Sequence, residues 1–392
     1  MDGRRRARAL SMSMPGRAEA AALLAVASVD EPRVEHLRAV SAAAQVFAEL
    51  PRPHRSLVRA LEVTAQVEPA GRASMLAAAV AAADSPAVAA FCGSLALDIE
   101  ERAPAEDAAK RALELAPAYP QALVLAARVA LAAGRLDTME EIAAKLDPTR
   151  AAEFQAVAAY EAGNLAALQT AVRKLAAGGG AGNKVCAAGE ERLRGVKRLT
   201  RERILALAGE DHLWGDLVAV DAALDAGDIA LAAELESRWS DPKQPLRAAR
   251  IARRLRYEGQ TEQAREAAAG AAPTPGALLE QLVLARSNAE RAPALAAVSS
   301  GAAPASRWLH IYGMALDGSV DQGVAAAGAL ELPSTSAPLG VRVAAALALA
   351  ELKDTVHATT VLIPLVSALP GNHDVISAAV RVRLLPEEAL KR

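Results

Sequence analysis

Apolar positions along the chain recur with helical spacing, in runs separated by short breaks that carry Gly, Asp or Pro. The clearest run covers residues 86–119, and a comparable run starts at Pro120, 34 residues after Pro86. Both runs open on proline, whose fixed φ suits the first position of a helix. The pattern predicts a repeat of helix pairs with a period of 34 residues in this part of the chain.

The second run shows how each predicted pair is built. It predicts a helix over 121–133, a turn over 134–137 and a second helix over 138–146. Gly134 suits the left-handed conformation that ends a helix, and Asp137 suits the N-cap of the next helix. Similar turns are expected at 162–164, 226–228, 258–260, 317–319 and 352–354, and two earlier helix pairs at 17–50 and 55–83. The chain is therefore predicted to be an all-α solenoid.

The composition favours helices that pack closely. Hydrophobic residues make up 53% of the chain and aromatic residues only 3%, so the apolar content comes mainly from Ala, Leu and Val. Ala and Leu form helices readily, whereas strands favour β-branched and aromatic side chains. Small residues at helix crossings let two helices approach closely, which a repeated helix pair requires.

One segment carries a recognisable signature. Residues 105–117 read AEDAAKRALELAP, and this segment resembles the end of a tetratricopeptide repeat, a 34-residue helix-turn-helix unit. With Pro117 at the family's position 32, Cys92 and Gly93 take its Leu-Gly positions. The small-residue positions 20, 24 and 27 of the family then fall on Ala105, Ala109 and Ala112. The resemblance implies a right-handed superhelix of antiparallel helix pairs, whose first helices line a concave groove that binds protein partners.

A glycine-rich segment interrupts the repeats. Residues 176–184 read AAGGGAGNK, and several consecutive glycines disfavour a helix. We expect four parts: a disordered basic tail at 1–16, an N-terminal helical arm at 17–177, a Gly-rich linker at 178–190 and a C-terminal helical arm at 191–392.

The charge balance and the cysteines narrow the classes of function. The chain has 44 basic and 46 acidic residues, so its net charge of −2 argues against a dedicated nucleic-acid binder. Cys92 and Cys186 are too few for a disulfide framework, and we expect two free thiols. No apolar run is long enough for a membrane span, and the basic N-terminus lacks the apolar region of a signal peptide, so a cytoplasmic location is expected.

The sequence offers no pattern of residues that is typical of catalysis. The Gly-rich segment lacks the Gly-Lys-Ser/Thr end and the preceding strand of a phosphate-binding loop. None of the six histidines has metal-ligand spacing, and neither cysteine has a histidine nearby. We therefore expect no catalytic residues, metal or cofactor. The three tryptophans, Trp214, Trp239 and Trp308, are predicted to pack in the core.

The strongest candidate for binding is an arginine-rich helix over 246–258. Its basic residues are Arg247, Arg250, Arg253, Arg254 and Arg256, with no acidic residue before Glu258. In the frame of the resemblance, with Gly259 at position 15, this is a first helix, and Arg250, Arg253 and Arg256 are expected to face the groove. Guanidinium groups suit carboxylate or phosphate partners. These five arginines are the predicted partner-binding residues, for a partner with an acidic segment.

A second basic stretch over 192–203 is interpreted as a solvated helix face, with a shared surface for an anionic partner as the alternative. The sequence thus favours a protein-interaction scaffold or adaptor. Two alternatives stay open: an enzyme or enzyme accessory that uses the superhelix as a substrate-binding platform, and a regulatory module that binds a polyanion. The sequence leaves the oligomeric state open.

Overall fold

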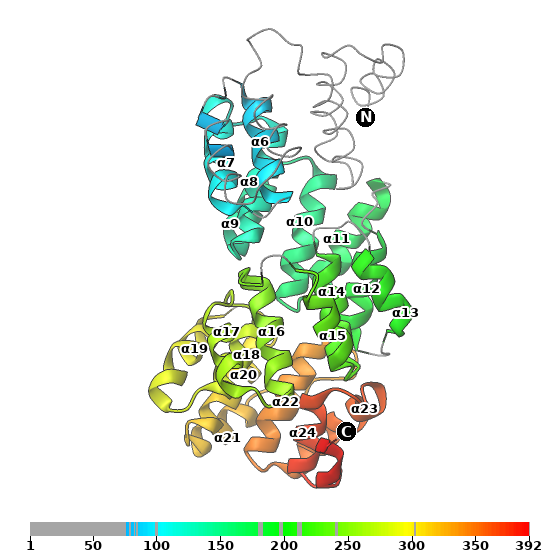
Figure 1. Ribbon diagram of the computed structural model, residues 1–392. Coiled ribbons are helices and arrows are strands. Elements are labelled where there is room, and N and C mark those ends of the chain that lie inside the picture. The colour runs from blue at the N-terminus through cyan, green and yellow to red at the C-terminus, as the bar shows by residue number, and fades with distance from the viewer. Residues whose placement is uncertain are drawn as a thin grey trace. The chain divides into compact units, whose positions relative to one another are not determined.

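The computed structural model describes residues 76–391 apart from 78–79, 82, 84, 99–100, 179–182, 196–198, 210–213, 240–241 and 302. The predicted basic tail, the helix pair predicted at 17–50 and most of the pair predicted at 55–83 lie outside the described residues. Within the described part every regular element is a helix, and the all-α prediction is confirmed (Figure 1). No helix of the described residues is long and apolar enough to cross a membrane.

The chain divides into two compact units, Met1–Ala151 and Ala152–Arg392, here called the N-terminal unit and the C-terminal unit. The described helices of the N-terminal unit are α6 (Pro86–Asp98), α7 (Arg102–Leu115), α8 (Pro120–Ala132) and α9 (Leu136–Ala143). Helix α10 (Pro148–Glu161) begins in the N-terminal unit and continues into the C-terminal unit.

The C-terminal unit continues with pairs of helices joined by short turns. These are α11 (Leu165–Gly178), α12 (Asn183–Arg194), α13 (Arg201–Gly209), α14 (Gly215–Asp225), α15 (Ile229–Glu236), α16 (Pro245–Tyr257), α17 (Thr261–Ala269), α18 (Pro275–Leu284), α19 (Asn288–Ser300), α20 (Ser306–Leu316), α21 (Val320–Gly328), α22 (Leu339–Glu351), α23 (Thr355–Ala368), α24 (His373–Arg381) and the short 3₁₀ helix η2 (Glu387–Lys391).

The boundary between the units differs from the expected linker. The sequence places a linker at 178–190, but α12 already begins at Asn183 and packs against α11 within the C-terminal unit. The glycine run at 179–182 lies outside the described residues. Helices α11 and α12, which flank this run, pack against each other within one compact unit.

Small residues allow the close helix crossing that the sequence predicts in the N-terminal unit. Ala105 and Ala112 are fully buried. A Cβ atom on Gly93 would lie 2.4 Å from Leu125 Cδ2 and 2.8 Å from Ala108 Cβ. Helices α6, α7 and α8 therefore meet where a larger side chain would not fit.

The predicted turn glycines adopt the left-handed conformation. Gly134, Gly163, Gly227, Gly259 and Gly318 have φ of 70°, 65°, 76°, 76° and 86°. The helix-starting role of aspartate is confirmed after two turns, because Asp228 and Asp354 accept hydrogen bonds from the backbone N–H groups of Leu231 and His357.

The predicted N-cap at Asp137 is wrong. Arg135 donates its backbone N–H to Ala130 at the end of α8, and its own carbonyl accepts from Met139 at the start of α9. Because one residue ends α8 and caps α9, Asp137 falls inside the first turn of α9. An acidic side chain there still interacts favourably with the helix N-terminus.

The C-terminal unit closes on itself. Successive first helices pack side by side from α12 to α24, and α22 also packs against α12. Arg342 of α22 donates a hydrogen bond to the carbonyl of Arg194. The turn before α24 also contacts the turn after α14. A Cβ atom on Gly371 would lie 2.1 Å from the carbonyl oxygen of Ala226, so the two backbones are in direct contact. The contacts of α22 with α12 thus close, within this unit, the groove that the resemblance implies.

The tryptophans are core residues, as predicted. Trp214, Trp239 and Trp308 are all buried, and all three belong to the C-terminal unit. Trp214 packs against Tyr160 of α10, with ring centroids 4.9 Å apart. Their large side chains fill the spaces between helices whose other contacts are made mostly by Ala, Leu and Val.

Candidate functional site in the interior of the C-terminal unit

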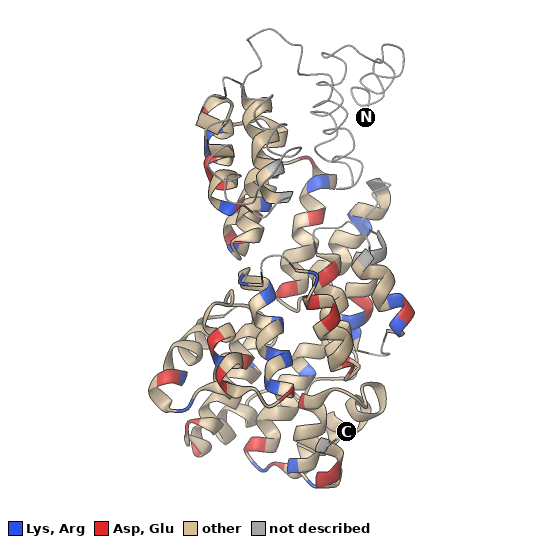
Figure 2. Ribbon diagram, in the orientation of Figure 1, with Lys and Arg blue, Asp and Glu red and all other residues tan. Residues whose placement is uncertain are grey.

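The arginine-rich helix is α16, and its first turn follows from Pro245 at the N-terminus. Arg250, Arg253 and Arg256 lie on the face that points into the C-terminal unit, while Leu246, Ala252 and Leu255 are buried among neighbouring helices. The inward orientation predicted for the three arginines is therefore found. Their immediate partners are carboxylates of this chain, contributed by α10, α14, α18 and α24. Figure 2 colours the basic residues of α16 blue and the acidic residues of the chain red.

Arg250 is buried between two acidic residues. Its Nη2 lies 2.7 Å from Glu161 Oε1 and 2.8 Å from Asp221 Oδ2, and its Nη1 donates to the carbonyl of Leu246 at 2.7 Å. Only 6% of Arg250 is exposed. A buried charge is tolerated when it is paired and hydrogen-bonded, which these contacts achieve.

Arg253 and Arg256 continue the network toward α24. Arg253 Nη2 donates to Asp225 Oδ1 at 2.8 Å, and its Nε lies 3.8 Å from Asp374 Oδ2. Arg256 contacts both oxygens of Glu280, at 2.6 and 2.8 Å, and Asp374 Oδ1 at 2.8 Å. Asp374 therefore joins α24 to α16 across 118 residues of sequence.

The other two arginines of the candidate set are also paired. Arg254 contacts Glu236 at 2.6 Å and Glu258 at 2.7 Å. Arg247 lies 3.4 Å from Asp216 and stacks over Trp239. All five predicted arginines thus have acidic partners within the chain, which the sequence analysis did not anticipate. Their role in binding a partner stays a prediction.

The second basic stretch contributes one arginine to the same interior. Arg192 of α12 contacts Asp225 at 2.7 Å, the hydroxyl of Tyr160 at 3.0 Å and Asp221 at 3.6 Å. Arg194, Arg201 and Arg203 form ion pairs with Glu190, Asp228 and Glu191 nearer the surface. Lys197 and Arg198 lie outside the described residues. These four arginines are the basic residues of the stretch that the structure describes. Each of them forms an ion pair with an acidic residue of the chain.

The acidic half of the network was missed at the sequence level. It consists of Glu161, Asp221, Asp225, Glu280 and Asp374. A signal is present in the spacing from the turn glycines. Asp225 lies two residues before Gly227, as Glu161 does before Gly163, and Asp221 lies six residues before Gly227, as Arg253 does before Gly259. Equal offsets place these side chains at the same inner level of successive first helices.

Ion pairing lowers the pKa of the buried carboxylates, whereas burial raises it. Burial opposes charge on Asp221, but Arg192, Arg250 and Arg253 outweigh it and lower the pKa to about 2. Arg256 and Arg253 likewise lower the pKa of Asp374 against the effect of burial. Burial raises the pKa of Glu161 despite its ion pair with Arg250, and the nearby negative charge of Asp221 raises it further. Asp221 and Asp374 are therefore ionised at neutral pH and hold the guanidinium groups in place.

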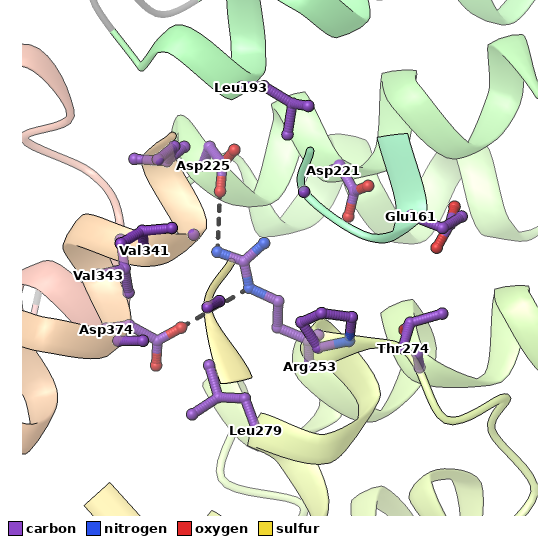
Figure 3. Close-up of a pocket in the computed structure, with 18 of the residues that line it drawn as sticks. Glu161, Leu193, Asp221, Asp225, Arg253, Thr274, Leu279, Val341, Val343 and Asp374 are labelled. Atoms are coloured by element: carbon purple, nitrogen blue, oxygen red, sulfur yellow. Dashed lines mark hydrogen bonds and ion pairs between the residues drawn. The ribbon is translucent and has the colours of Figure 1, made fainter. Parts of the chain in front are cut away.

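A cavity opens beside this network, with about 980 Å³ of empty space including its mouth. One wall is polar and includes Glu161, Asp221, Asp225, Arg253 and Asp374, drawn in Figure 3. Apolar side chains complete the lining, here called the apolar wall, and they include Leu193, Leu279, Leu309, Leu339, Val341 and Val343. Gly276 and Gly340 are exposed at its rim, at the starts of α18 and α22.

The lining of the cavity also carries hydroxyl groups. Its hydroxyl groups belong to Thr274, which caps α18, and Tyr160, whose pKa is raised by burial. Tyr160 donates its hydroxyl to Asp221 at 2.8 Å. Among the described residues no group of His, Cys, Asp and Glu is arranged to hold a metal ion. The polar wall is a set of paired charges, and such a set fixes the positions of its side chains.

Comparison with known proteins adds one structural similarity. Neither the protein-family models nor the curated proteins contain a match to this chain. A chain in the "Crystal structure of APC/C hetero-tetramer Cut9-Hcn1" is similar at 11% sequence identity and a TM-score of 0.39, over 96% of this chain and 79% of that chain. The helix pairs themselves show that the fold is a helical repeat.

Proposed function

We propose that the protein is an interaction scaffold whose C-terminal unit receives a segment of a partner protein in the cavity beside the ion-pair network. The observation that carries this proposal is the convergence of successive first helices, α10 to α24, on one cavity with a polar wall and an apolar wall. Helical repeats present such inner surfaces to partner segments, and pockets of this kind bind amphipathic groups.

The ion pairs support this function by keeping the polar wall rigid. Arg250, Arg253 and Arg256 each contact two carboxylates, and the carboxylates come from different helices. A wall that is ordered before binding loses little further conformational entropy when a ligand enters. The network thus prepares the site and need not neutralise an acidic partner.

Two of the alternatives receive less support. A polyanion-binding module needs unpaired basic groups on one face, but the described arginines of both basic stretches have acidic partners. A substrate-binding platform would use the same cavity, yet nothing in its described lining favours a reaction over simple binding.

The proposal is tested by site-specific crosslinking in cells that produce the full-length chain. A photoreactive amino acid replaces Gly340, which is exposed at the rim and has no atoms within 4 Å of its Cβ position. The control carries the same amino acid at Val356, which is 75% exposed on α23 and lies outside the cavity lining. We expect a distinct set of proteins trapped from position 340. Trapping of the same proteins from both positions, or of none from position 340, would contradict the proposed function.

A further inference from the structure

The hydrogen bonds of the polar wall leave a donor on Arg253 and an acceptor on Asp221 without a partner among the described residues. Arg253 donates to described residues from Nε, to Tyr257 at 2.8 Å, and from Nη2, to Asp225. Its Nη1 makes no hydrogen bond to a described residue. Figure 3 shows Arg253 extending between Asp225 and Asp374 beside the cavity space. Nη1 is therefore the guanidinium nitrogen that remains for a ligand.

The remaining acceptor belongs to Asp221. Both hydrogen bonds that Asp221 accepts from described residues, from Tyr160 and from Arg250, end on Oδ2. Oδ1 accepts none from the described part of the chain, although a carboxylate oxygen has room for two. Asp221 is only 6% exposed and lines the cavity. An acceptor in this position gains most from a donor that the ligand brings.

The charges around these two atoms select against a charged ligand. The charge of Arg253 is already compensated by the carboxylates of Asp225 and Asp374, so a ligand carboxylate at Nη1 gains little attraction. The charge of Asp221 is likewise compensated by the guanidinium groups of Arg192 and Arg250, so a ligand cation at Oδ1 gains little attraction. A charged ligand group that gains little attraction in a buried site still loses its hydration.

An uncharged group that both accepts and donates hydrogen bonds satisfies both positions, and a peptide amide is such a group. The apolar wall, with Leu279, Leu309 and Val341, matches an aliphatic side chain attached to it. We propose that the cavity recognises an uncharged, aliphatic peptide segment. Its backbone amides accept from Arg253 Nη1 and donate to Asp221 Oδ1. This inference rests on the proposed function and specifies the chemistry of the segment that enters.

Three small probes with the same leucine side chain test this assignment. They are N-acetyl-leucinamide, which is neutral, N-acetyl-leucine, which carries a carboxylate, and leucinamide, which carries an amine. Binding to the full-length chain is followed by NMR of the methyl groups of Leu279 and Val341. We expect the neutral probe to bind at least tenfold more tightly than either charged probe.

Two variants link the binding to the cavity. Val341→Trp places a large side chain in the apolar wall at the rim and should abolish the shifts. Val356→Trp, the same change at an exposed site on α23, should leave them intact. Arg253→Lys keeps the charge but removes the forked donor, and it should weaken the neutral probe without strengthening N-acetyl-leucine.

Several outcomes would overturn the inference. Tighter binding of N-acetyl-leucine would assign the cavity to acidic segments, and tighter binding of leucinamide would assign it to basic ones. Equal binding by all three probes would remove the role of Arg253 and Asp221. If no probe binds while crosslinking at position 340 still traps partners, the amide assignment fails and the proposed scaffold function stands.

Discussion

Asp374 connects helix α24 to helix α16 of the C-terminal unit, and its replacement is the most informative stability experiment. Asp374 is 3% exposed. It accepts from Arg256 Nη1 at 2.8 Å and from the Tyr257 hydroxyl at 2.7 Å. Asp374→Asn keeps the shape and an acceptor for Tyr257 but removes the negative charge that faces Arg253 and Arg256. The substitution therefore isolates the contribution of charge.

The expected cost is about 3 kcal/mol of unfolding free energy. Removing one partner of a buried ion pair costs about 3–5 kcal/mol, because the other charge stays buried without compensation. The low end of this free-energy range applies, because in the variant Arg256 still pairs with Glu280 and Arg253 still pairs with Asp225. With an m-value of about 3 kcal/mol/M, the urea midpoint should fall by about 1 M.

Tryptophan fluorescence measures this change in the C-terminal unit alone, because all three tryptophans of the chain lie there. The matched control is Glu262→Gln. Glu262 also contacts two arginines, Arg265 and Arg286, but its side chain is 70% exposed. An exposed ion pair contributes about 0–1 kcal/mol, so the control should shift the midpoint little. Equal and small shifts in the two variants would refute the view that the buried network closes the unit.

The dependence on pH provides a second reading of the same experiment. The pKa of Asp374 is lowered in the folded protein by Arg256 and Arg253, which outweigh the opposing effect of burial. A carboxylate with a depressed folded pKa stabilises the fold above its unfolded pKa of about 3.9, and this contribution is lost as the pH falls toward the folded value. The difference between wild type and Asp374→Asn should therefore be constant from pH 7 to about pH 5 and shrink below pH 4. A difference that already vanishes at pH 6 would contradict the assignment.

Three further predictions test other parts of the structure. Gly371→Ala should lower the urea midpoint strongly, since its Cβ would lie 2.1 Å from the Ala226 carbonyl oxygen, whereas Gly340→Ala, with no atoms within 4 Å, should not. Asp221, whose pKa of about 2 is depressed by nearby arginines, should contribute about 2 kcal/mol at pH 7 that is lost as the pH falls from about 4 toward 2; an Asp221→Asn variant with unchanged stability at pH 7 would exclude this. Burial raises the pKa of Cys92 and Cys186 to about 12, so a thiol reagent at pH 8 should label them only as fast as the protein unfolds, and rapid labelling of the native chain would argue against their burial.

The sequence by itself determined the helices and most of the turns. Helical spacing, abundant Ala and Leu, and prolines at 86 and 120 depend on local backbone preferences, and local preferences can be read one segment at a time. The left-handed glycines at 134, 163 and 259 follow for the same reason, since glycine adopts positive φ without a steric penalty. The inward face of Arg250 and Arg253 was implied by the resemblance, which places them by their offsets to Gly259.

Only the tertiary structure decided what that face meets. The partners of Arg250 lie 29 and 89 residues away, and the Asp374 partner of Arg256 lies 118 residues away. Contacts at such separations depend on the curvature that accumulates over several helix pairs, and no local pattern specifies that curvature. An arginine on an inner helix is compatible with a free binding surface and with an internal ion pair. Because α22 and α24 pack onto α12 and α14, the arginines of α16 form internal ion pairs. The cavity to which we assign binding lies beside these ion pairs.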